Sequence, residues 1–165
     1  DNTVSVIDGA TNSMVATIPV GSFPHSVAVN WKTNRVYVTD QGGNAVTVLD
    51  SVRDVVVATI PVGQSPGAVG VNETTNRAYV ANNRDTVSVL DGATNRLLTT
   101  LAIGSYPAGI AVDPATSRIY VTELGDNALW LIQDHRLGLP TARMIARAAP
   151  GDPSLLPGQT ICPCR

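Results

Sequence analysis

The feature that most constrains this chain is that it repeats itself. The segment GSFPHSVAVNWKTNRVYVTD returns as GQSPGAVGVNETTNRAYVAN and again as GSYPAGIAVDPATSRIYVTE. The prolines Pro24, Pro66 and Pro107 lie 42 and 41 residues apart and so fix the period. A period of this length is typical of stacked supersecondary units, because one such unit cannot bury its apolar faces alone.

Each repeat contains four short runs rich in Val, Ile and Thr, bounded by Gly, Asn, Asp and Pro, which is the pattern of β-strands. No segment has the 3.6-residue apolar period of a helix. Some runs, such as Val36-Tyr37-Val38, are apolar at consecutive positions. In a sheet with one face exposed to water, apolar and polar residues would alternate along each strand. The pattern therefore predicts four-stranded antiparallel sheets stacked on both faces, as in a β-propeller.

Several motifs recur in the same order in every unit. The runs RVYVTD, RAYVAN and RIYVTE, together with TVSVIDGATN and TVSVLDGATN, resemble YVTN-type β-propeller repeats over residues 1–132. The resemblance implies that the SVAVN-type strand is innermost (A), followed by RVYV (B), TVSVID (C) and the outermost VATIPVG (D). The chain then runs C–D, two full A–B–C–D blades and A–B–C, an all-β fold with about three blades present.

This number of blades is too small for a closed ring, since propellers have at least four. We expect a chain cropped at its N-terminus that is completed by further blades of a longer chain or by a second copy. In one arrangement, the N-terminal C–D pair of each copy completes the last blade of the other. Residues 133–165 leave the pattern as a Pro- and Gly-rich tail, in which residues 142–146 resemble an outer strand.

Composition narrows the classes of partner. The chain is 44% hydrophobic and 15% charged with a formal net charge of −2, as in a soluble globular protein. No basic cluster favours nucleic acid, and no apolar run approaches the ~20 residues that span a bilayer. Cysteine occurs only as Cys162 and Cys164, a redox pair or an intermolecular link at most, so we expect no disulfide framework, metal or cofactor in the repeats.

Residues kept in every repeat are expected to serve the repeat itself. The glycine three residues before each proline is assigned to a tight crossing loop. The arginine at the start of strand B is assigned to turn carbonyls or a neighbouring acid in preference to an anion, and the tyrosine to the core. The aspartates that end strand C are assigned to local turn bonds in preference to calcium. These residues are Gly21, Gly63, Gly104, Arg35, Arg77, Arg118, Tyr37, Tyr79, Tyr120, Asp8, Asp50 and Asp91.

Residues that break the repeat are the functional candidates. In propellers the D–A and B–C loops share one face, which is usually the binding face. The unrepeated residues of these loops are Phe23, His25, Asp40, Gln41, Gln64, Arg84, Tyr106, Glu123 and Asp126. All except the two glutamines are retained as candidate contacts of a ligand or partner.

Three other positions allow two interpretations each. His25 replaces Gly67 and Ala108 of the other repeats, and it either binds a metal or moves protons beside carboxylates, or is a polar residue at the channel mouth. Trp31, on the opposite face, is either a contact anchor or a cover for the underside. Asn72 begins a formal N-glycosylation sequon of a kind that is common by chance.

No nucleophile elbow, Walker loop, dinucleotide fingerprint or HExxH motif occurs. The sequence therefore favours a non-catalytic binding or scaffold module, and the resemblance implies an exported protein, periplasmic, extracellular or at the cell surface. The alternative is the propeller domain of an enzyme, a lactonase-like hydrolase, a lyase or a redox-enzyme subunit. That alternative requires His25, Asp40, Glu123 or Asp126 to converge near the channel.

Overall fold

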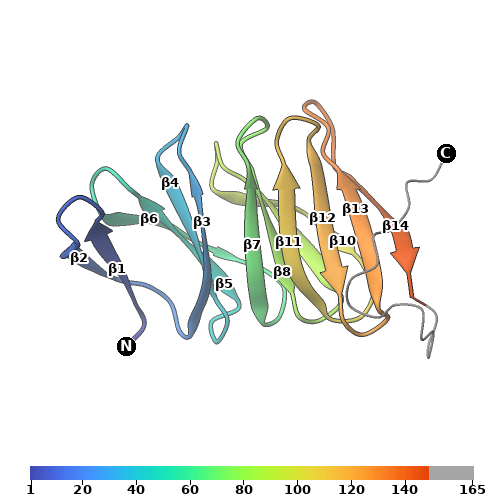
Figure 1. Ribbon diagram of the computed structural model, residues 1–165, viewed down its shortest axis with the longest axis horizontal. Coiled ribbons are helices and arrows are strands. Elements are labelled where there is room, and N and C mark those ends of the chain that lie inside the picture. The colour runs from blue at the N-terminus through green and yellow to red at the C-terminus, as the bar shows by residue number, and fades with distance from the viewer. Residues whose placement is uncertain (149–165) are drawn as a thin grey trace.

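The computed structural model describes residues 1–148, which fold into fourteen β-strands without helices (Figure 1). That part of the chain accordingly contains no helix long and apolar enough to cross a membrane. The strands are β1 (Thr3–Asp8), β2 (Ser13–Pro19), β3 (Pro24–Asn30), β4 (Arg35–Asp40), β5 (Ala45–Asp50), β6 (Val55–Pro61), β7 (Pro66–Asn72), β8 (Arg77–Asn82), β9 (Thr86–Asp91), β10 (Arg96–Ala102), β11 (Pro107–Asp113), β12 (Arg118–Glu123), β13 (Ala128–Gln133) and β14 (Thr141–Arg147).

The strands form four antiparallel sheets in chain order. The first contains only β1 and β2, and the others are β3–β6, β7–β10 and β11–β14. Within each four-stranded sheet, neighbours in sequence are neighbours in space, so every connection is a hairpin. Figure 1 shows the sheets side by side along the long axis of the molecule, with β1 and β2 at one end and β14 at the other. The predicted all-β fold of four-stranded antiparallel sheets is confirmed.

The last sheet has four strands, whereas the repeat pattern predicted three. Residues 142–146, the suggested outer strand, lie within β14, which pairs with β13. The C–D loop before β14 spans residues 134–140, compared with only 51–54 in the second sheet, and the longer loop obscures the period in the sequence. Because β14 occupies this place, the C–D pair of a second copy cannot complete the sheet. Cys162 and Cys164 lie outside the described residues.

The hairpins turn tightly because residues tolerant of positive φ end them. Asn34, Asn44 and Asp54 end the three turns of the second sheet with φ of 53°, 51° and 55°, and Asn and Asp adopt this conformation more readily than most residues. Asp50, at the end of strand C, accepts a hydrogen bond from the backbone N–H of Val52 at 3.0 Å, which lowers the pKa of its carboxyl. The prediction of local turn bonds at this aspartate is confirmed.

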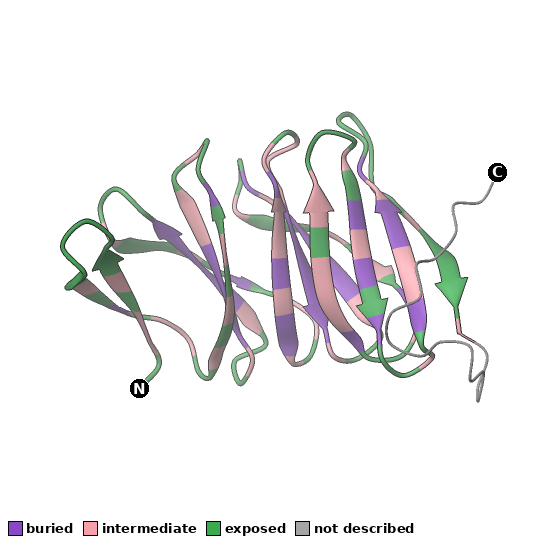
Figure 2. Ribbon diagram, viewed as in Figure 1, coloured by how far each residue is buried: buried purple, intermediate pink, exposed green. Residues whose placement is uncertain are grey.

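The core lies between successive sheets, as the buried stretches in Figure 2 show. Tyr37 and Val80 belong to the cluster between the second and third sheets, and Tyr79 and Ile119 to the cluster between the third and fourth. Strands β4, β5, β8 and β9 are buried over nearly their whole length because each has a sheet on both sides. Each fully buried aliphatic side chain contributes about 1.5–3 kcal/mol to this packing.

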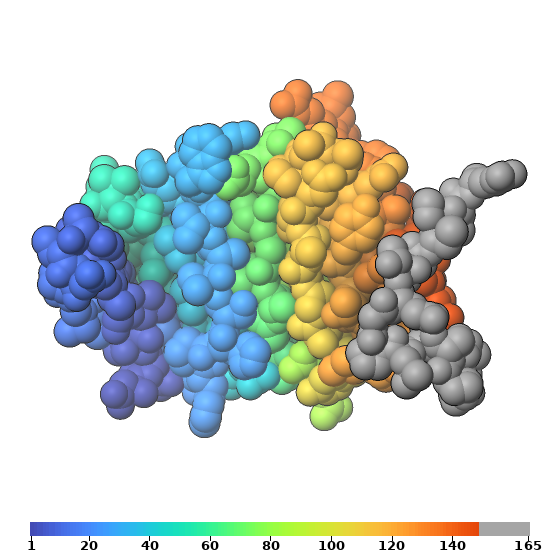
Figure 3. Space-filling model, viewed as in Figure 1, coloured from blue at the N-terminus to red at the C-terminus, as the bar shows by residue number. Residues whose placement is uncertain are grey.

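The array is open at the end that carries β1. The inner strands β3, β7 and β11 contact one another in succession. Val69 and Val71 of β7 pack into the cluster that β7 shares with the second sheet. Their counterparts Val27 and Val29 on β3 are 57% and 52% exposed, because the first sheet supplies only its two outer strands. Figure 3 shows the β1–β2 hairpin as the end of the molecule beside β3.

Candidate functional site

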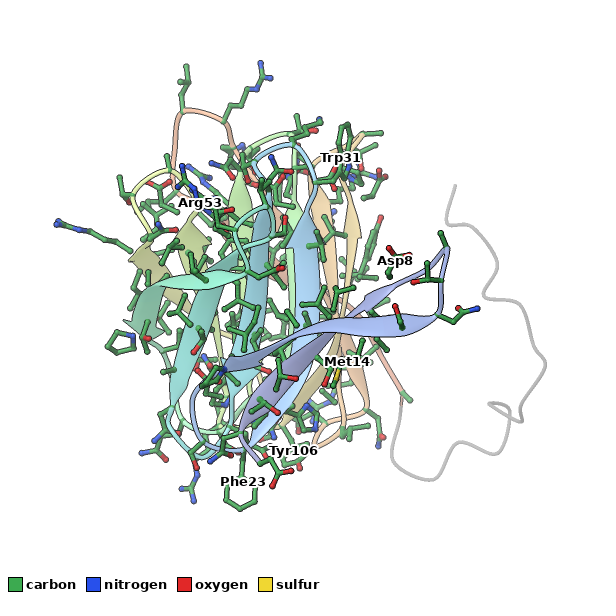
Figure 4. All side chains as sticks on the ribbon, turned by 90° about the vertical axis from the view of Figure 1, so that its left-hand side faces the viewer. Asp8, Met14, Phe23, Trp31, Arg53 and Tyr106 are labelled. Atoms are coloured by element: carbon green, nitrogen blue, oxygen red, sulfur yellow. The ribbon has the colours of Figure 1, made fainter. Side chains whose placement is uncertain are left out.

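The D–A and B–C loops are joined to one another at one end of the blades. The backbone N–H of Gln41 donates to the carbonyl of Phe23 at 2.9 Å, and that of Leu124 donates to the carbonyl of Tyr106 at 3.0 Å. We call this surface the loop face, formed by residues 20–23, 41–44, 62–65, 83–85, 103–106 and 124–127. Figure 4 shows Phe23 and Tyr106 at this end and Trp31 and Arg53 at the other.

Phe23, Ser65 and Tyr106 occupy the same position in successive D–A loops. Their φ values are 53°, 54° and 64°, so all three are left-handed. This conformation costs a residue with a Cβ about 1–2 kcal/mol, and it is unusual for a bulky side chain. The left-handed backbone is therefore a property of the D–A loop. It does not require the aromatic side chains found in two of the three loops.

The two aromatic side chains project from the loop face. Phe23 is 73% exposed and Tyr106 is 48% exposed, so neither ring is needed for the core. Phe23 is the only phenylalanine of the chain. Aromatic rings supply large contact areas in interfaces, and single exposed ones often carry a disproportionate part of the binding energy. These two predicted candidates are available for contact.

Asp40 and Glu123 are buried, although they break the repeat in residue type. They share the last position of strand B with Asn82, and all three are buried. Each forms a hydrogen bond with strand C of its own sheet. The pairs are Thr47 Oγ1 to Asp40 Oδ2 at 2.6 Å, Asn82 Nδ2 to Ser88 Oγ at 2.9 Å and Trp130 Nε1 to Glu123 Oε2 at 3.0 Å.

These buried side chains explain the repeated glycines. A Cβ on Gly21 would lie 2.7 Å from Cβ of Asp40, and one on Gly63 would lie 3.0 Å from Cβ of Asn82. None of these glycines needs a positive φ, which falls instead on the residue two positions later. The glycine is therefore kept for space and not for conformational freedom, which corrects the reason drawn from the sequence.

Burial also changes the acid chemistry of the two carboxyl groups. Desolvation raises the pKa of Asp40, against the opposing effect of the hydrogen bond from Thr47. Desolvation likewise raises the pKa of Glu123, and the nearby carboxylate of Asp126 adds to the increase. Each carboxyl ties strand B to strand C through one oxygen, and its second oxygen is buried without a partner in the described structure.

His25 lines a pocket that contains no acidic residue. It occupies the irregular position of β3, where the register with β4 shifts between Pro24 and Ser26. Its side chain is exposed and lines a shallow pocket of about 180 Å³ between β1 and β3, together with Thr3, Val4 and Val27 and without any acid. Across residues 1–148, no group of three His, Cys, Asp or Glu residues could hold a metal ion.

The remaining charged candidates of the loop face have charges of opposite sign beside them. Asp126 accepts from Arg147 at 2.9 Å, and its second oxygen lies 3.4 Å from the backbone nitrogen of Ser105. Arg84 is exposed and is followed in sequence by Asp85. The surface pair of Arg147 and Asp126 stabilises the fold only slightly. Since Arg84 and Asp85 also have opposite charges, the exposed part of the loop face carries little net charge.

The opposite face carries the repeated arginines. Arg35 donates to the carbonyl of Asn34 at 3.2 Å and pairs with Asp50 at 3.1 Å, which confirms the predicted turn-and-acid role of this residue. Trp31 is 66% exposed, and the ammonium group of Lys32 lies 5.5 Å from the centre of its ring. Trp31 therefore does not cover the underside in the described structure.

Asp134 is a buried acid that the sequence did not identify. It stands where the third sheet has Gly92, and its carboxylate accepts from Arg77 at 2.5 Å, from Asn72 at 3.0 Å and from the hydroxyl of Thr75. These donors belong to the preceding sheet, so the acid joins the last two sheets. Because Asn72 is fully buried, the sequon is inaccessible in the folded chain.

Comparisons with known proteins agree with the blade architecture. A family model described as the NHL repeat, a β-propeller-type repeat, matches residues 22–49, which is most of one blade. No curated protein matches the chain. The fold defines a class: an open array of β-propeller blades.

Three solved structures with the same fold are similar to this chain, each at 18% identity. They are hydrazine synthase of Kuenenia stuttgartiensis (TM-score 0.72, covering 87% of this chain and 43% of that one), a functionally unknown protein from Desulfotomaculum acetoxidans (0.71, 88% and 48%) and dihydro-heme d1 dehydrogenase NirN (0.69, 88% and 33%). The chain spans less than half the length of each. At this identity the likeness shows the fold alone.

Proposed function

We propose that this chain is a non-catalytic binding module, a part of a YVTN-type propeller that holds its partner on the loop face. The observation that carries the proposal is the pair Phe23 and Tyr106, two exposed rings on left-handed backbone where the third loop has Ser65. The left-handed backbone recurs at Ser65, so the feature that distinguishes the other two loops is the exposed aromatic ring, a side chain of the type that often carries binding energy.

The arrangement of the polar candidates supports a binding role over a catalytic one. Asp40 and Glu123 are engaged with Thr47 and Trp130, and His25 lines a pocket that contains no acid. A general base needs its proton within hydrogen-bond reach, and a metal site needs several converging ligands. The enzyme alternative would therefore depend on residues supplied by blades beyond this array.

We also propose that further strands of a longer chain complete the ring, in an exported protein. Val27 and Val29 are the support for this, because the same positions on β7 are covered by a neighbouring sheet. The pocket beside His25 lies where the two inner strands of the first blade would pack. Exposed strand edges invite such pairing.

The test is a binding screen with matched variants. Peptide, glycan and small-molecule libraries are screened against the chain, against the double variant F23S/Y106S and against W31S, which removes the exposed ring of the opposite face. Ligands that bind the chain and W31S but not the double variant support the proposal. Ligands lost only in W31S, or turnover of ester and lactone substrates that H25A abolishes, would overturn it.

A further inference from the structure

The backbone that carries the two aromatic residues is held in place before any ligand arrives. The backbone N–H of Phe23 donates to Asn2 Oδ1 at 3.0 Å, and its carbonyl accepts from Gln41 at 2.9 Å. The carbonyl of Tyr106 is held in the same way by Leu124 at 3.0 Å. A preorganised aromatic side chain loses little conformational entropy on binding, which favours affinity.

The ring of Phe23 rests on a glycine. A Cβ on Gly42 would lie 2.8 Å from Cδ2 of Phe23, so the neighbouring B–C loop supports one side of the ring. Figure 4 shows the Phe23 ring protruding beyond the ends of the strands, with Tyr106 at the same end. The loop face therefore presents two exposed rings, of which that of Phe23 is supported by the neighbouring loop.

Between the rings the surface is polar, and beside Tyr106 it also carries the exposed side chain of Leu124. The D–A loop between them contributes Gln64 and Ser65, and the loop of Tyr106 adds Ser105. Arg147 neutralises Asp126. Hydroxyl and amide groups both donate and accept hydrogen bonds, so they suit a ligand with many hydroxyls.

From this combination we infer that Phe23 and Tyr106 are stacking platforms of a site for a neutral oligosaccharide. A pyranose ring presents a face of C–H groups that stacks on an aromatic ring, and its hydroxyls require neutral donors and acceptors around that face. A folded protein partner would favour one contiguous apolar core, whereas these rings stand on loops separated by Ser65. The inference rests on the proposed function, because it specifies which class of ligand binds the loop face.

The experiment is calorimetric titration of the chain with neutral hexasaccharides at up to about 1 mM, the range where weak specific binding is measured. The probes are cellohexaose, N-acetylchitohexaose, maltohexaose and laminarihexaose, with oligogalacturonate as a charged comparison. The variants are F23S and Y106S, which copy Ser65 at the same backbone position, and W31S as the control on the opposite face. Each loop-face variant should weaken binding at least about tenfold, as for an interface hot spot, and W31S should not.

The outcomes separate the inference from the proposed function. Binding of one neutral hexasaccharide that both loop-face variants reduce supports the inference. Absence of binding by all neutral probes, preference for the charged one, or equal binding by all variants overturns it. If saccharides fail while peptide or small-molecule ligands still depend on Phe23 and Tyr106, only the ligand class is wrong. If no ligand depends on these residues, the proposed function fails as well.

Discussion

The indole Nε1 of Trp130 donates to Oε2 of Glu123 over 3.0 Å, across two neighbouring strands of the last sheet. In the second sheet the hydroxyl of Thr47 makes the equivalent bond to Asp40 at 2.6 Å. The longer acid Glu123 is thus paired with the large donor Trp130, and the shorter acid Asp40 with the small donor Thr47, at the same position of the two sheets. Residue types differ between repeats, yet the hydrogen bond that ties strand B to strand C is kept.

We predict that E123A lowers the free energy of unfolding by about 1–3 kcal/mol, because it removes the buried acceptor of Trp130 and leaves a void. Trp130 also packs against the core cluster that contains Tyr79 and Ile119, so the matched single change is W130F, which keeps a ring and removes the donor, and E123A/W130F completes the cycle. Urea unfolding of the single and double variants gives the coupling energy. Strict additivity would show that the pair is not one unit.

We predict that G21A destabilises the chain by about 1–3 kcal/mol, the usual cost of overpacking. The added Cβ would lie 2.7 Å from Cβ of Asp40, which is held between strands and cannot move aside. The double variant G21A/D40A should be less destabilised than the two single changes together predict. Thermal unfolding is the measurement, with the same substitution at the unobstructed Gly9 as control. An equal loss at Gly9 would contradict the steric explanation.

We predict that D40N changes how stability depends on pH. Burial raises the folded-state pKa of Asp40, so the folded chain binds this proton more tightly than the unfolded chain. Ionisation therefore costs stability as the pH rises from the ordinary value of 3.8 through the raised one. Asn cannot ionise, and Asn82 already fills the equivalent position.

Relative to the unaltered chain, D40N should consequently have a higher free energy of unfolding at about pH 7 than at about pH 4.5. Denaturant unfolding at the two pH values measures it. A difference that is constant with pH, or one that favours D40N more at the lower pH, would show that the carboxyl is not destabilised by burial.

We predict that D134G lowers stability by about 3 kcal/mol, because removing one partner of a buried ion pair leaves the other charge uncompensated. In D134G, Arg77 loses the carboxylate with which it is paired. The backbone itself should tolerate the change, because the equivalent residue of the third sheet is Gly92. R53A is the matched control: its 3.9 Å pair with Asp50 is at the surface and should matter by no more than about 0.5 kcal/mol. Equal losses in the two variants would contradict the role of Asp134.

The sequence predicted the blades because strands and turns depend on local patterns. The Val-rich runs and the Asn and Asp turns recur at one period, so each hairpin could be placed without knowledge of its neighbours. The fourth strand of the last sheet was only suggested, because residues 134–140 lengthen the loop before β14. Asp134 lies in that same loop, and its partners on β7 and β8 are far away in sequence.

The candidate site was predicted less completely. Exposed positions such as Phe23 and Tyr106 were found because they break the repeat on loops. Asp40 and Glu123 also break the repeat in type, but they are polar side chains at the same offset as Asn82. Because a polar residue occurs at this position in every repeat, the sequence did indicate that Asp40 and Glu123 are structural. The steric reason for Gly21 required knowing which side chain packs above it, which no local pattern contains.

The measurement that tests the account most directly is a map of ligand-induced shifts in the backbone amide spectrum of the isotope-labelled chain, with any ligand that the screen identifies. The account predicts that the perturbed amides gather in residues 21–23, 63–65 and 104–106, and that F23S/Y106S abolishes the shifts while keeping the folded spectrum. Shifts centred on Trp31 and Arg53, or shifts that persist unchanged in the double variant, would contradict it.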